Sequence, residues 1–338
     1  MAISSLDDLR AQLKKLPTAD DASRAKTNDR EPQLTKPPGS LGQLEEIAAW
    51  ASTWQRQYPP RLSRPCARVF AGNHGVVVRG VSAYPAEVTQ QMVYGFEAGT
   101  AAINQICKTF DIELQVIPID LEEPTADFTT APALSVEEFV SAFNLGMAAV
   151  PSDADLICLG EMGIGNTTSA AAICHALYGG DAAEWTGQGT GVVGEAFDIK
   201  VQVVADGVKH HRADITDGID VLRCLGGREL VAIGGAIVAA RQNAVPVMID
   251  GFISTAAAAT LEATQPGALD HCLIAHASAE KGHKKVLDAL NKTALLDLGM
   301  RLGEASGAAL AVGIVKAAIN CHNDMATFAE AGVTGKED

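Results

Sequence analysis

Apolar runs and helical patterns alternate through the middle of the chain, and this alternation limits the possible folds more than any other feature. Strands are predicted at residues 67–71, 113–119, 155–160, 229–233, 246–250 and 271–275. Helices are predicted at residues 86–109, 136–148, 166–178, 197–212, 235–243 and 252–263. Strands that alternate with helices form a parallel sheet with helices on both faces. The prediction is therefore an α/β fold with a doubly wound, mostly parallel six-stranded sheet.

The segments before and after this alternation show helical patterns only. Leu6, Leu9 and Leu13 recur at helical spacing near the start, and residues 43–55 predict a further helix. The tail predicts helices at residues 280–291, 293–302 and 306–320. We expect the two helical segments, 1–62 and 279–338, to form one small lobe beside an α/β domain at 63–278.

The charge of the 338-residue chain is strongly negative, at −15. This argues against nucleic acid as a partner, because a phosphate backbone needs a basic surface. A small anionic substrate remains compatible with the charge, since a few local donors outweigh it. No run of about 18 apolar residues free of charge and glycine occurs, so no membrane span and no membrane partner is expected.

The cysteines and the N-terminus predict a cytoplasmic protein. The seven cysteines are scattered, without a Cys-x-x-Cys pair, as is typical of reduced, buried thiols. The first residues lack the basic and apolar regions of a signal peptide.

A glycine-rich turn joins one predicted strand to the helix that follows it. Residues 160–168 read Gly-Glu-Met-Gly-Ile-Gly-Asn-Thr-Thr. In open α/β sheets the backbone N–H groups and the helix N-terminus at such a turn bind an anion. Asn166, Thr167 and Thr168 add side-chain donors and N-cap candidates. The alternative is a tight connection that binds nothing, since the turn is neither Gly-x-Gly-x-x-Gly nor a P-loop.

Two glutamates lie in glycine-flanked turns within apolar sequence, Glu161 and Glu304. Burial there would raise the pKa of each carboxyl group towards the value of a general base. Glu161 beside an anion-binding turn suggests a phosphorylated substrate whose reacting group needs a carboxylate nearby. The alternatives are a solvated residue at either position and, for Glu304, a first-turn acid favoured by the helix dipole.

Several other polar residues are candidates for the same site, each with a plain structural alternative. Lys200 would pair with a phosphate or lie on the surface. Asp250 ends a predicted strand and would bind ribose hydroxyls or cap the next helix. His276 and His283 flank Ser278 and would line the site or be structural.

The remaining histidines do not predict a metal site. His74, in Asn73-His-Gly75, is a candidate base or metal ligand, but no second histidine lies at ligand spacing. His210 and His211 lie in a polar helical pattern and are expected to be solvated. We expect neither a metal nor a cofactor.

Seven motifs occur in one order between about residue 30 and residue 320. They are Lys36-Pro-Pro-Gly-Ser-Leu-Gly42, Asn73-His-Gly75, the run 160–168, Asp217-Gly-Ile-Asp220, Asp250-Gly-Phe252, Ser278-Ala-Glu-Lys-Gly282 and Arg301-Leu-Gly-Glu-Ala-Ser-Gly307. Together they resemble the nicotinate-nucleotide–dimethylbenzimidazole phosphoribosyltransferase family, which makes the lower-ligand nucleotide of cobalamin. The α/β domain would then bind the nucleotide.

The resemblance implies a reaction and a set of site residues. A lower-ligand base attacks the anomeric carbon of nicotinate mononucleotide, nicotinate leaves with inversion, and α-ribazole 5′-phosphate forms. Glu304 matches the family's general base, which takes the azole N–H proton, and Glu161 matches its second active-site glutamate. Phosphate- and ribose-binding positions match Gly163, Gly165, Asn166, Thr167, Thr168, Lys200 and Ser278, with Asp250 nearby. The base pocket is expected around Ser82, Tyr84, Gln91 and Leu302.

The resemblance also implies two small-molecule partners, nicotinate mononucleotide and a benzimidazole-type base, and a homodimer. Dimethylbenzimidazole is the expected base. Adenine, another benzimidazole or a phenol stays open, because one sequence does not define the register of the base pocket.

Two other classes of protein compete with this interpretation. A dehydrogenase would need Gly-x-Gly-x-x-Gly after its first strand, and Gly72-Asn-His-Gly75 does not comply. A non-catalytic protein that binds nucleotides or corrinoid precursors would not need Glu304 in an apolar turn. Release of nicotinate from nicotinate mononucleotide with an added benzimidazole would separate the three.

Overall fold

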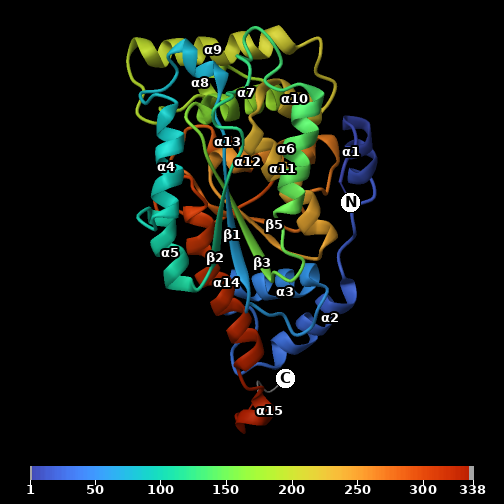
Figure 1. Cartoon of the computed structure of the whole chain (residues 1–338). Helices are drawn as coiled ribbons and strands as arrows, with labels where there is room; N and C mark the ends of the chain where they lie inside the picture. Colours follow the sequence, from blue (N-terminus) through green and yellow to red (C-terminus); the bar gives the residue numbers. More distant parts are fainter. Residues whose placement is uncertain (1, 335–338) are drawn as a thin grey trace.

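A computed structural model describes residues 2–334 and contains one six-stranded sheet, whose strands are all parallel (Figure 1). The strands are β1 (Pro65–Ala71), β2 (Glu113–Pro118), β3 (Leu156–Met162), β4 (Val247–Ile249), β5 (Cys272–His276) and β6 (Ala294–Leu296). Their order is β2-β1-β3-β4-β5-β6, and every neighbouring pair is parallel. The predicted α/β class and parallel sheet are confirmed. The direction of winding reverses between β1 and β3, and ligands bind at such a reversal, outside the carboxyl ends of the strands.

Helices cover both faces of the sheet. They are α4 (Glu87–Glu97), α5 (Ala102–Phe110), α6 (Val136–Ala148), α7 (Asn166–Tyr178), α8 (Ala182–Trp185), α9 (Glu195–His211), α10 (Gly218–Leu225), α11 (Arg228–Gln242), α12 (Phe252–Thr264) and α13 (His283–Leu290), with a 3-10 helix, η2, at Gly75–Arg79. Side chains alternate between the faces along β3, because successive residues of a strand point to opposite sides. Ile157 and Leu159 pack in the core with α7, α11 and α12, whereas Leu156 and Cys158 pack in a second core.

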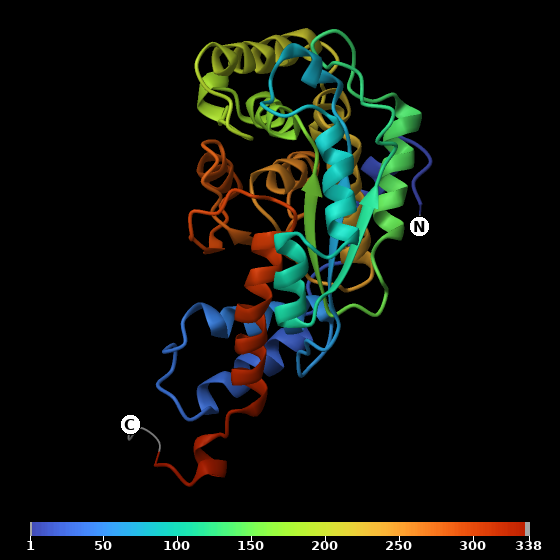
Figure 2. The same ribbon diagram turned by 60° about the vertical axis from the view of Figure 1, so that its left-hand side comes forward.

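The second core packs α3 and α14 from the terminal segments, together with α5, against the other face of the sheet. These segments contain α1 (Leu6–Leu13), α2 (Asp21–Arg30), η1 (Glu31–Gln33), α3 (Gln43–Gln55), α14 (Ser306–Asp324) and α15 (Phe328–Ala331). Trp50 of α3 and Val312 of α14 belong to this core, whereas Leu9 of α1 belongs to the first. Figures 1 and 2 show α2, α3 and the end of α14 side by side, far from α9. A separate small lobe stays a prediction.

Polar contacts also join the two termini. The Arg30 guanidinium donates to the carbonyl groups of His322 and Met325, at 3.1 and 3.0 Å. The Lys36 ammonium group lies 3.0 Å from the Glu31 carboxylate and 2.6 Å from the Glu45 carboxylate. Lys36 and its motif therefore lie in this terminal region.

Two predicted elements are wrong. Residues 229–233, predicted as a strand, lie inside the helix α11, and the sixth strand is instead β6, inside the predicted helix 293–302. The helix α11 is buried on all sides, and a short apolar run has no periodicity that separates a buried helix from a buried strand. The strand β6 has three residues, and its pairing with β5 defines it.

Most other predicted helices occur, with differences at their ends. The helices α6 and α7 have the predicted bounds, whereas the predicted helix 86–109 is two helices, α4 and α5, separated at Gly99 by a positive φ of 73°. The helix α10 was not predicted; the Asp217 carboxylate caps it by accepting from two backbone N–H groups. Within residues 2–334, no helix is long and apolar enough to cross a membrane.

Candidate active site

A cavity of about 200 Å³ lies where the carboxyl ends of β3, β4 and β5 meet the start of α7. Its lining residues come from five segments: Glu161–Ile164 with Asn166 and Thr167, then Gly189 and Thr190, Gly251–Ile253, Ser278 with Glu280, and Arg301–Gly303. The informative turns of the sequence therefore meet at one edge of the sheet, as expected for a doubly wound fold.

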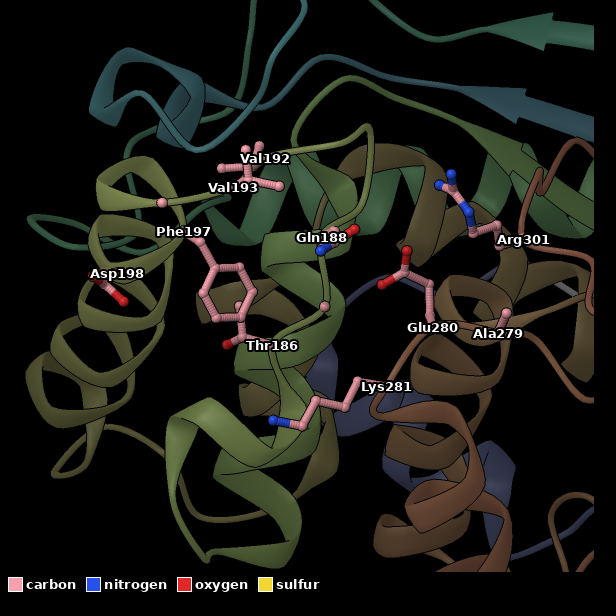
Figure 3. Close-up of a pocket in the computed structure, with 12 residues that line it drawn as sticks. Thr186, Gln188, Val192, Val193, Phe197, Asp198, Ala279, Glu280, Lys281 and Arg301 are labelled. Carbon is pink, nitrogen blue, oxygen red and sulfur yellow. The ribbon is translucent and has the colours of Figure 1, made fainter.

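A larger cavity of about 610 Å³ adjoins the first, and Glu280 and Arg301 line both. Figure 3 shows Val192, Val193 and Phe197 on one side of this second cavity and Ala279, Glu280 and Arg301 on the other. The Arg301 guanidinium donates to the Gly189 carbonyl at 3.1 Å. One Glu280 oxygen, Oε2, is buried without a hydrogen-bond partner among the described residues.

The glycine-rich turn forms one wall of the first cavity. Gly165 has a φ of 96°, which favours glycine, and a Cβ at Gly163 would lie 2.7 Å from the Gly72 carbonyl oxygen. No side chain caps α7, so the positive end of its dipole is available beside Asn166 and Thr167, which line the cavity. Thr168 is buried, and its hydroxyl has no partner within residues 2–334. This wall has the features of an anion-binding site.

Lys200 contacts the same wall from α9. Its ammonium group donates to Thr167 Oγ1 at 2.9 Å and to the Gly187 carbonyl at 3.0 Å. The side chain is fully buried, so the alternative of a surface lysine is wrong. Burial lowers the pKa of Lys200 to about 8, while the charge of Glu280 opposes this effect. A buried cation beside Thr167 would complement an anion in the cavity.

Glu161 lines the first cavity near the end of β3. Its carboxylate accepts a hydrogen bond from the Asn166 amide. Burial raises the pKa of Glu161 well above its ordinary value, and the charges of Asp250 and Glu229 raise it further. Burial therefore favours the neutral form of this carboxyl group.

Glu304 lies directly after the lining residues Leu302 and Gly303, is not itself among the lining residues, and is 4% exposed. Its backbone N–H donates to the Glu161 carbonyl at 3.1 Å, so the two glutamates are neighbours. Burial, followed by the charge of Asp250, raises the pKa of Glu304 to about 7. Within residues 2–334, the Glu304 carboxylate has no hydrogen-bond or ion-pair partner. A carboxylate with such a pKa and a free acceptor is suited to take a proton at neutral pH.

Of the other predicted nucleotide-binding residues, Ser278 lines the cavity and Asp250 does not. Ser278 lines the first cavity, and its hydroxyl accepts from the Glu280 N–H at 3.2 Å. Asp250 is fully buried and is not among the lining residues; its neighbour Gly251 is. The Asp250 carboxylate accepts instead from the backbone of α14.

The predicted base-pocket residues are only partly gathered at the cavity. Leu302 lines it. Ser82, Tyr84 and Gln91 do not, although the Ser82 hydroxyl lies 3.2 Å from the hydroxyl of Thr190, which does. Tyr84 is 53% exposed.

Three of the histidines named from the sequence, His74, His211 and His283, are buried and hydrogen-bonded within the fold, whereas His210 is exposed. His74 is buried, 2.5 Å from the Glu229 carboxylate and 3.0 Å from the Ser169 hydroxyl. His283 accepts from the Ser278 N–H at 2.7 Å, and burial lowers its pKa to about 3. His211 is buried and donates to the Phe128 carbonyl at 2.8 Å, so its predicted solvation is wrong. No group of three or more potential metal ligands occurs within residues 2–334.

The model of a protein family described as "Phosphoribosyltransferase" matches residues 16–333. The chain belongs to this phosphoribosyltransferase family. It is 54% identical over 338 residues to the nicotinate-nucleotide–dimethylbenzimidazole phosphoribosyltransferase of Rhizobium rhizogenes, covering 99% of this chain and 100% of the relative. It is 55% identical over 337 residues to the enzyme of the same name from Methylorubrum extorquens, covering 99% and 98%.

A solved structure supports the same membership. The crystal structure of CobT from Thermus thermophilus superposes with a TM-score of 0.85 at 38% identity, covering 93% of this chain and 100% of that one. The family resemblance drawn from seven sequence motifs is therefore confirmed.

Sequence reasoning did not single out two residues that line both cavities of this phosphoribosyltransferase, Arg301 and Glu280. Each lies inside a motif that carries the family resemblance, Arg301–Gly307 and Ser278–Gly282. The motifs therefore contained both residues, but an arginine or a glutamate in a loop is usually exposed to solvent and has no role in a site. Only the fold shows that both side chains lie between the two cavities.

Proposed function

We propose that the protein transfers the phosphoribosyl group of nicotinate mononucleotide to dimethylbenzimidazole. The products are nicotinate and α-ribazole 5′-phosphate, with inversion at the anomeric carbon. The observation that carries the proposal is Glu304, a buried carboxylate with a pKa of about 7 and no partner within residues 2–334, which directly follows the lining residues Leu302 and Gly303. Relatives that bear this enzyme's name match over the full length of the chain.

The 5′-phosphate binds at the start of α7 in this proposal. Gly163, Gly165 and Asn166 supply the turn and its N–H groups, and Thr167 is held by the Lys200 ammonium group. Thr168, the next residue of α7, is buried, and Ser278 lines the same cavity for the ribose. The phosphate does not react; it fixes the position of the anomeric carbon, which converts binding energy into orientation.

Glu304 acts as the general base. A neutral azole is a modest nucleophile, and removal of its N–H proton as the new bond forms avoids a cationic product. The proton moves from the azole nitrogen to the Glu304 carboxylate while the other ring nitrogen attacks. The pyridinium leaving group is already cationic, so nicotinate departs without a proton from the enzyme.

Glu161 has a different role. Its position at the end of β3 and its bond from Asn166 place it at the cavity wall. A cationic ring that enters the cavity favours the ionised form of a nearby carboxyl group. We assign Glu161 to orienting the ribose and to stabilising the positive charge that develops at the anomeric carbon.

The acceptor base is proposed to bind towards Leu302, Ser82, Tyr84 and Gln91. Leu302 lines the cavity, and Ser82 is linked to it through Thr190. Tyr84 and Leu302 are large, exposed apolar side chains, at 53% and 54%, which suits a flat apolar ring.

The experiment is a direct assay of both products. Purified protein is incubated with nicotinate mononucleotide and dimethylbenzimidazole, and nicotinate and α-ribazole 5′-phosphate are quantified by chromatography. Equal amounts of both are expected, with none when the base is omitted. The control is nicotinate riboside, which lacks the phosphate and should react poorly. Nicotinate release that does not depend on the base would contradict the proposal.

We also propose that the protein is a cytoplasmic homodimer. Val78, Tyr84 and Tyr94 are exposed by 81%, 53% and 60% within one short stretch of chain, and exposed apolar patches mark interaction surfaces. Most soluble oligomers have two-fold symmetry. Light scattering should give twice the chain mass of 35.2 kDa. A fully active species of 35.2 kDa would defeat this part of the proposal.

A further inference from the structure

The turn that carries Glu304 has an unusual backbone. Gly303, Glu304 and Ala305 have successive φ angles of 82°, 61° and 60°. Two of these residues carry a Cβ, for which the left-handed conformation is unfavourable. Such a conformation persists only where the surrounding structure holds it. Two kinds of contact hold this turn, a carboxylate that caps the next helix and close packing against two strands.

A carboxylate from the sheet supplies the first of these contacts. The helix α14 starts at Ser306, and its N-cap residue Ala305 has no side-chain acceptor for the free N–H groups. Asp250, directly after β4, fills this gap: its Oδ1 accepts from Gly307 N at 3.0 Å and from Ala308 N at 3.1 Å. Asp250 thus caps a helix that starts 56 residues later in the chain.

Close packing supplies the rest. A Cβ at Gly160 of β3 would lie 2.0 Å from Ala305 N, and a Cβ at Gly307 would lie 2.0 Å from His276 Nδ1 of β5. The turn is therefore fixed between β3 and β5. Within this packing, the N–H of Glu304 donates to the Glu161 carbonyl.

We propose that Asp250 is a positioning residue for the general base: its carboxylate caps α14 and so holds the turn of residues 303–305 in the conformation that sets Glu304 beside the cavity. This proposal rests on the role of Glu304 in the proposed function. It replaces the ribose contact expected from the sequence, because Asp250 is fully buried and does not line the cavity.

The charge of Asp250 adds a second effect on Glu304. Burial is the larger cause that raises the pKa of Glu304 to about 7, and the charge of Asp250 is the second cause. Glu161 on β3 also interacts electrostatically with Glu304, and His276 on β5 faces Asp250, with its Nδ1 3.3 Å from Asp250 Oδ1. A like charge nearby favours the protonated form of a carboxyl group. Removal of the Asp250 charge should therefore lower the pKa of Glu304.

Two substitutions separate the cap from the charge. Asp250→Asn keeps an oxygen that accepts from Gly307 and Ala308 but removes the charge. The acid limb of the pH profile, the range in which kcat/KM falls as the pH is lowered, should therefore move down by about one pH unit. Asp250→Ala removes both, and a misplaced Glu304 should lower kcat by about 10²-fold. In both variants the KM for nicotinate mononucleotide should change less than kcat.

A second helix cap in the same protein is the matched control. Asp217 Oδ1 accepts from the N–H groups of Ile219 and Asp220 at the start of α10, in the same manner. Asp217→Asn and Asp217→Ala should lower the unfolding temperature without moving the acid limb. If the acid limb of kcat/KM shifts equally in the Asp217 variants, the shift comes from a general loss of stability. That result would overturn the proposal.

A measurement on the ligand-free protein separates this proposal from the proposed function. Carbon NMR of protein labelled at glutamate side-chain carboxyl carbons follows the titration of Glu304, whose signal is the one missing in Glu304→Gln. The titration midpoint of Glu304 should fall in Asp250→Asn whether or not the wild-type protein releases nicotinate. Absence of nicotinate release would refute the proposed function but not this proposal. A Glu304 midpoint that is unchanged in both Asp250→Asn and Asp250→Ala, or a rise in nucleotide KM that exceeds the loss in kcat in Asp250→Ala, would overturn the positioning role.

Discussion

The two glutamates of the site lie in turns that are built in different ways. Glu161 is the second-last residue of the regular strand β3, and its carboxylate accepts from Asn166. Glu304 lies in a left-handed turn, and its carboxylate has no partner among the described residues. The satisfied carboxylate is held in place, whereas the unsatisfied one keeps its acceptor free. In the proposed function, orientation and proton transfer are divided between these two neighbouring turns.

The strained backbone of the second turn allows the chain to reverse its direction. A strand end or a helix face would present Glu304 with ordinary backbone angles, but the chain must reverse directly from the cavity wall into α14. Left-handed angles at Glu304 and Ala305 make this reversal in two residues. Strained residues of this kind cluster at active sites because the surrounding fold can hold them.

The largest expected effect concerns the proton acceptor. Glu304→Gln keeps the size of the side chain and removes its basicity, so kcat should fall about 10²- to 10⁴-fold. Glu161→Gln keeps an acceptor oxygen and should lose less. Both are measured as nicotinate release at saturating dimethylbenzimidazole, with nucleotide binding followed by calorimetry. If Glu304→Gln turns over like the wild type, the division of roles between the turns is incorrect.

The same substitution should stabilise the fold at alkaline pH. The pKa of Glu304 is about 7 in the native protein against 4.5 for the ordinary group. The native state therefore binds a proton that the unfolded chain has released, and stability falls as the pH rises from 4.5 through 7. Glutamine does not titrate, so above pH 7 the variant should gain about 3 kcal/mol relative to the wild type.

Urea unfolding of both proteins at pH 4.5 and pH 8 measures this difference. Near pH 4.5 the two free energies of unfolding should be similar, and the gap should open only towards pH 8. A gap of the same size at both values would mean that Glu304 is not the group that titrates.

The next effect concerns the wall of the first turn. Lys200→Ala removes a buried cation that holds Thr167. A hydrogen bond to a charged group contributes about 1.5–3 kcal/mol, so KM for nicotinate mononucleotide should rise about 10- to 10²-fold, with a smaller change in KM for the base. Initial rates with each substrate varied in turn measure both constants. Equal changes for the two substrates would place Lys200 away from the phosphate.

The first turn was predictable from the sequence, because its signals are local. Residues 155–178 show an apolar run, a glycine-rich turn and a helical pattern in direct succession, and the structure has β3 and α7 there. Glu161 was found by the same reasoning, since it lies within the turn itself. The family motifs then pointed to Glu304, but not to its backbone conformation.

The second turn depends on contacts between distant parts of the chain, which local patterns do not record. Asp250 was expected to bind ribose or to cap the next helix, α12, whereas it caps α14. Lys200 lies in an amphipathic helical pattern with a surface alternative, and its burial depends on Thr167 and Gly187 from other segments. Local patterns mistake part of the buried helix α11 for a strand for the same reason: its surroundings, not its periodicity, decide its form.

The smallest expected effect is on the pH profile, and it assigns one limb to each turn. Glu304 must be ionised to accept a proton, so kcat/KM should fall below its pKa of about 7. Lys200 must be protonated to attract the phosphate, so kcat/KM should also fall above its pKa of about 8. Each limb should approach a tenfold loss per pH unit, because kcat/KM reports the free enzyme. The phosphate of the nucleotide itself has a pKa of about 6, below both limbs.

The variants decide whether the limbs are assigned correctly. Glu304→Gln should lose the acid limb and keep the basic one, whereas Lys200→Ala should lose the basic limb and keep the acid one. Lys200→Arg, whose guanidinium stays protonated in this range, should extend activity towards higher pH if the larger group fits. A basic limb that persists unchanged in both Lys200 variants belongs to another group, and the phosphate would then be held by the turn and the start of α7 without the lysine.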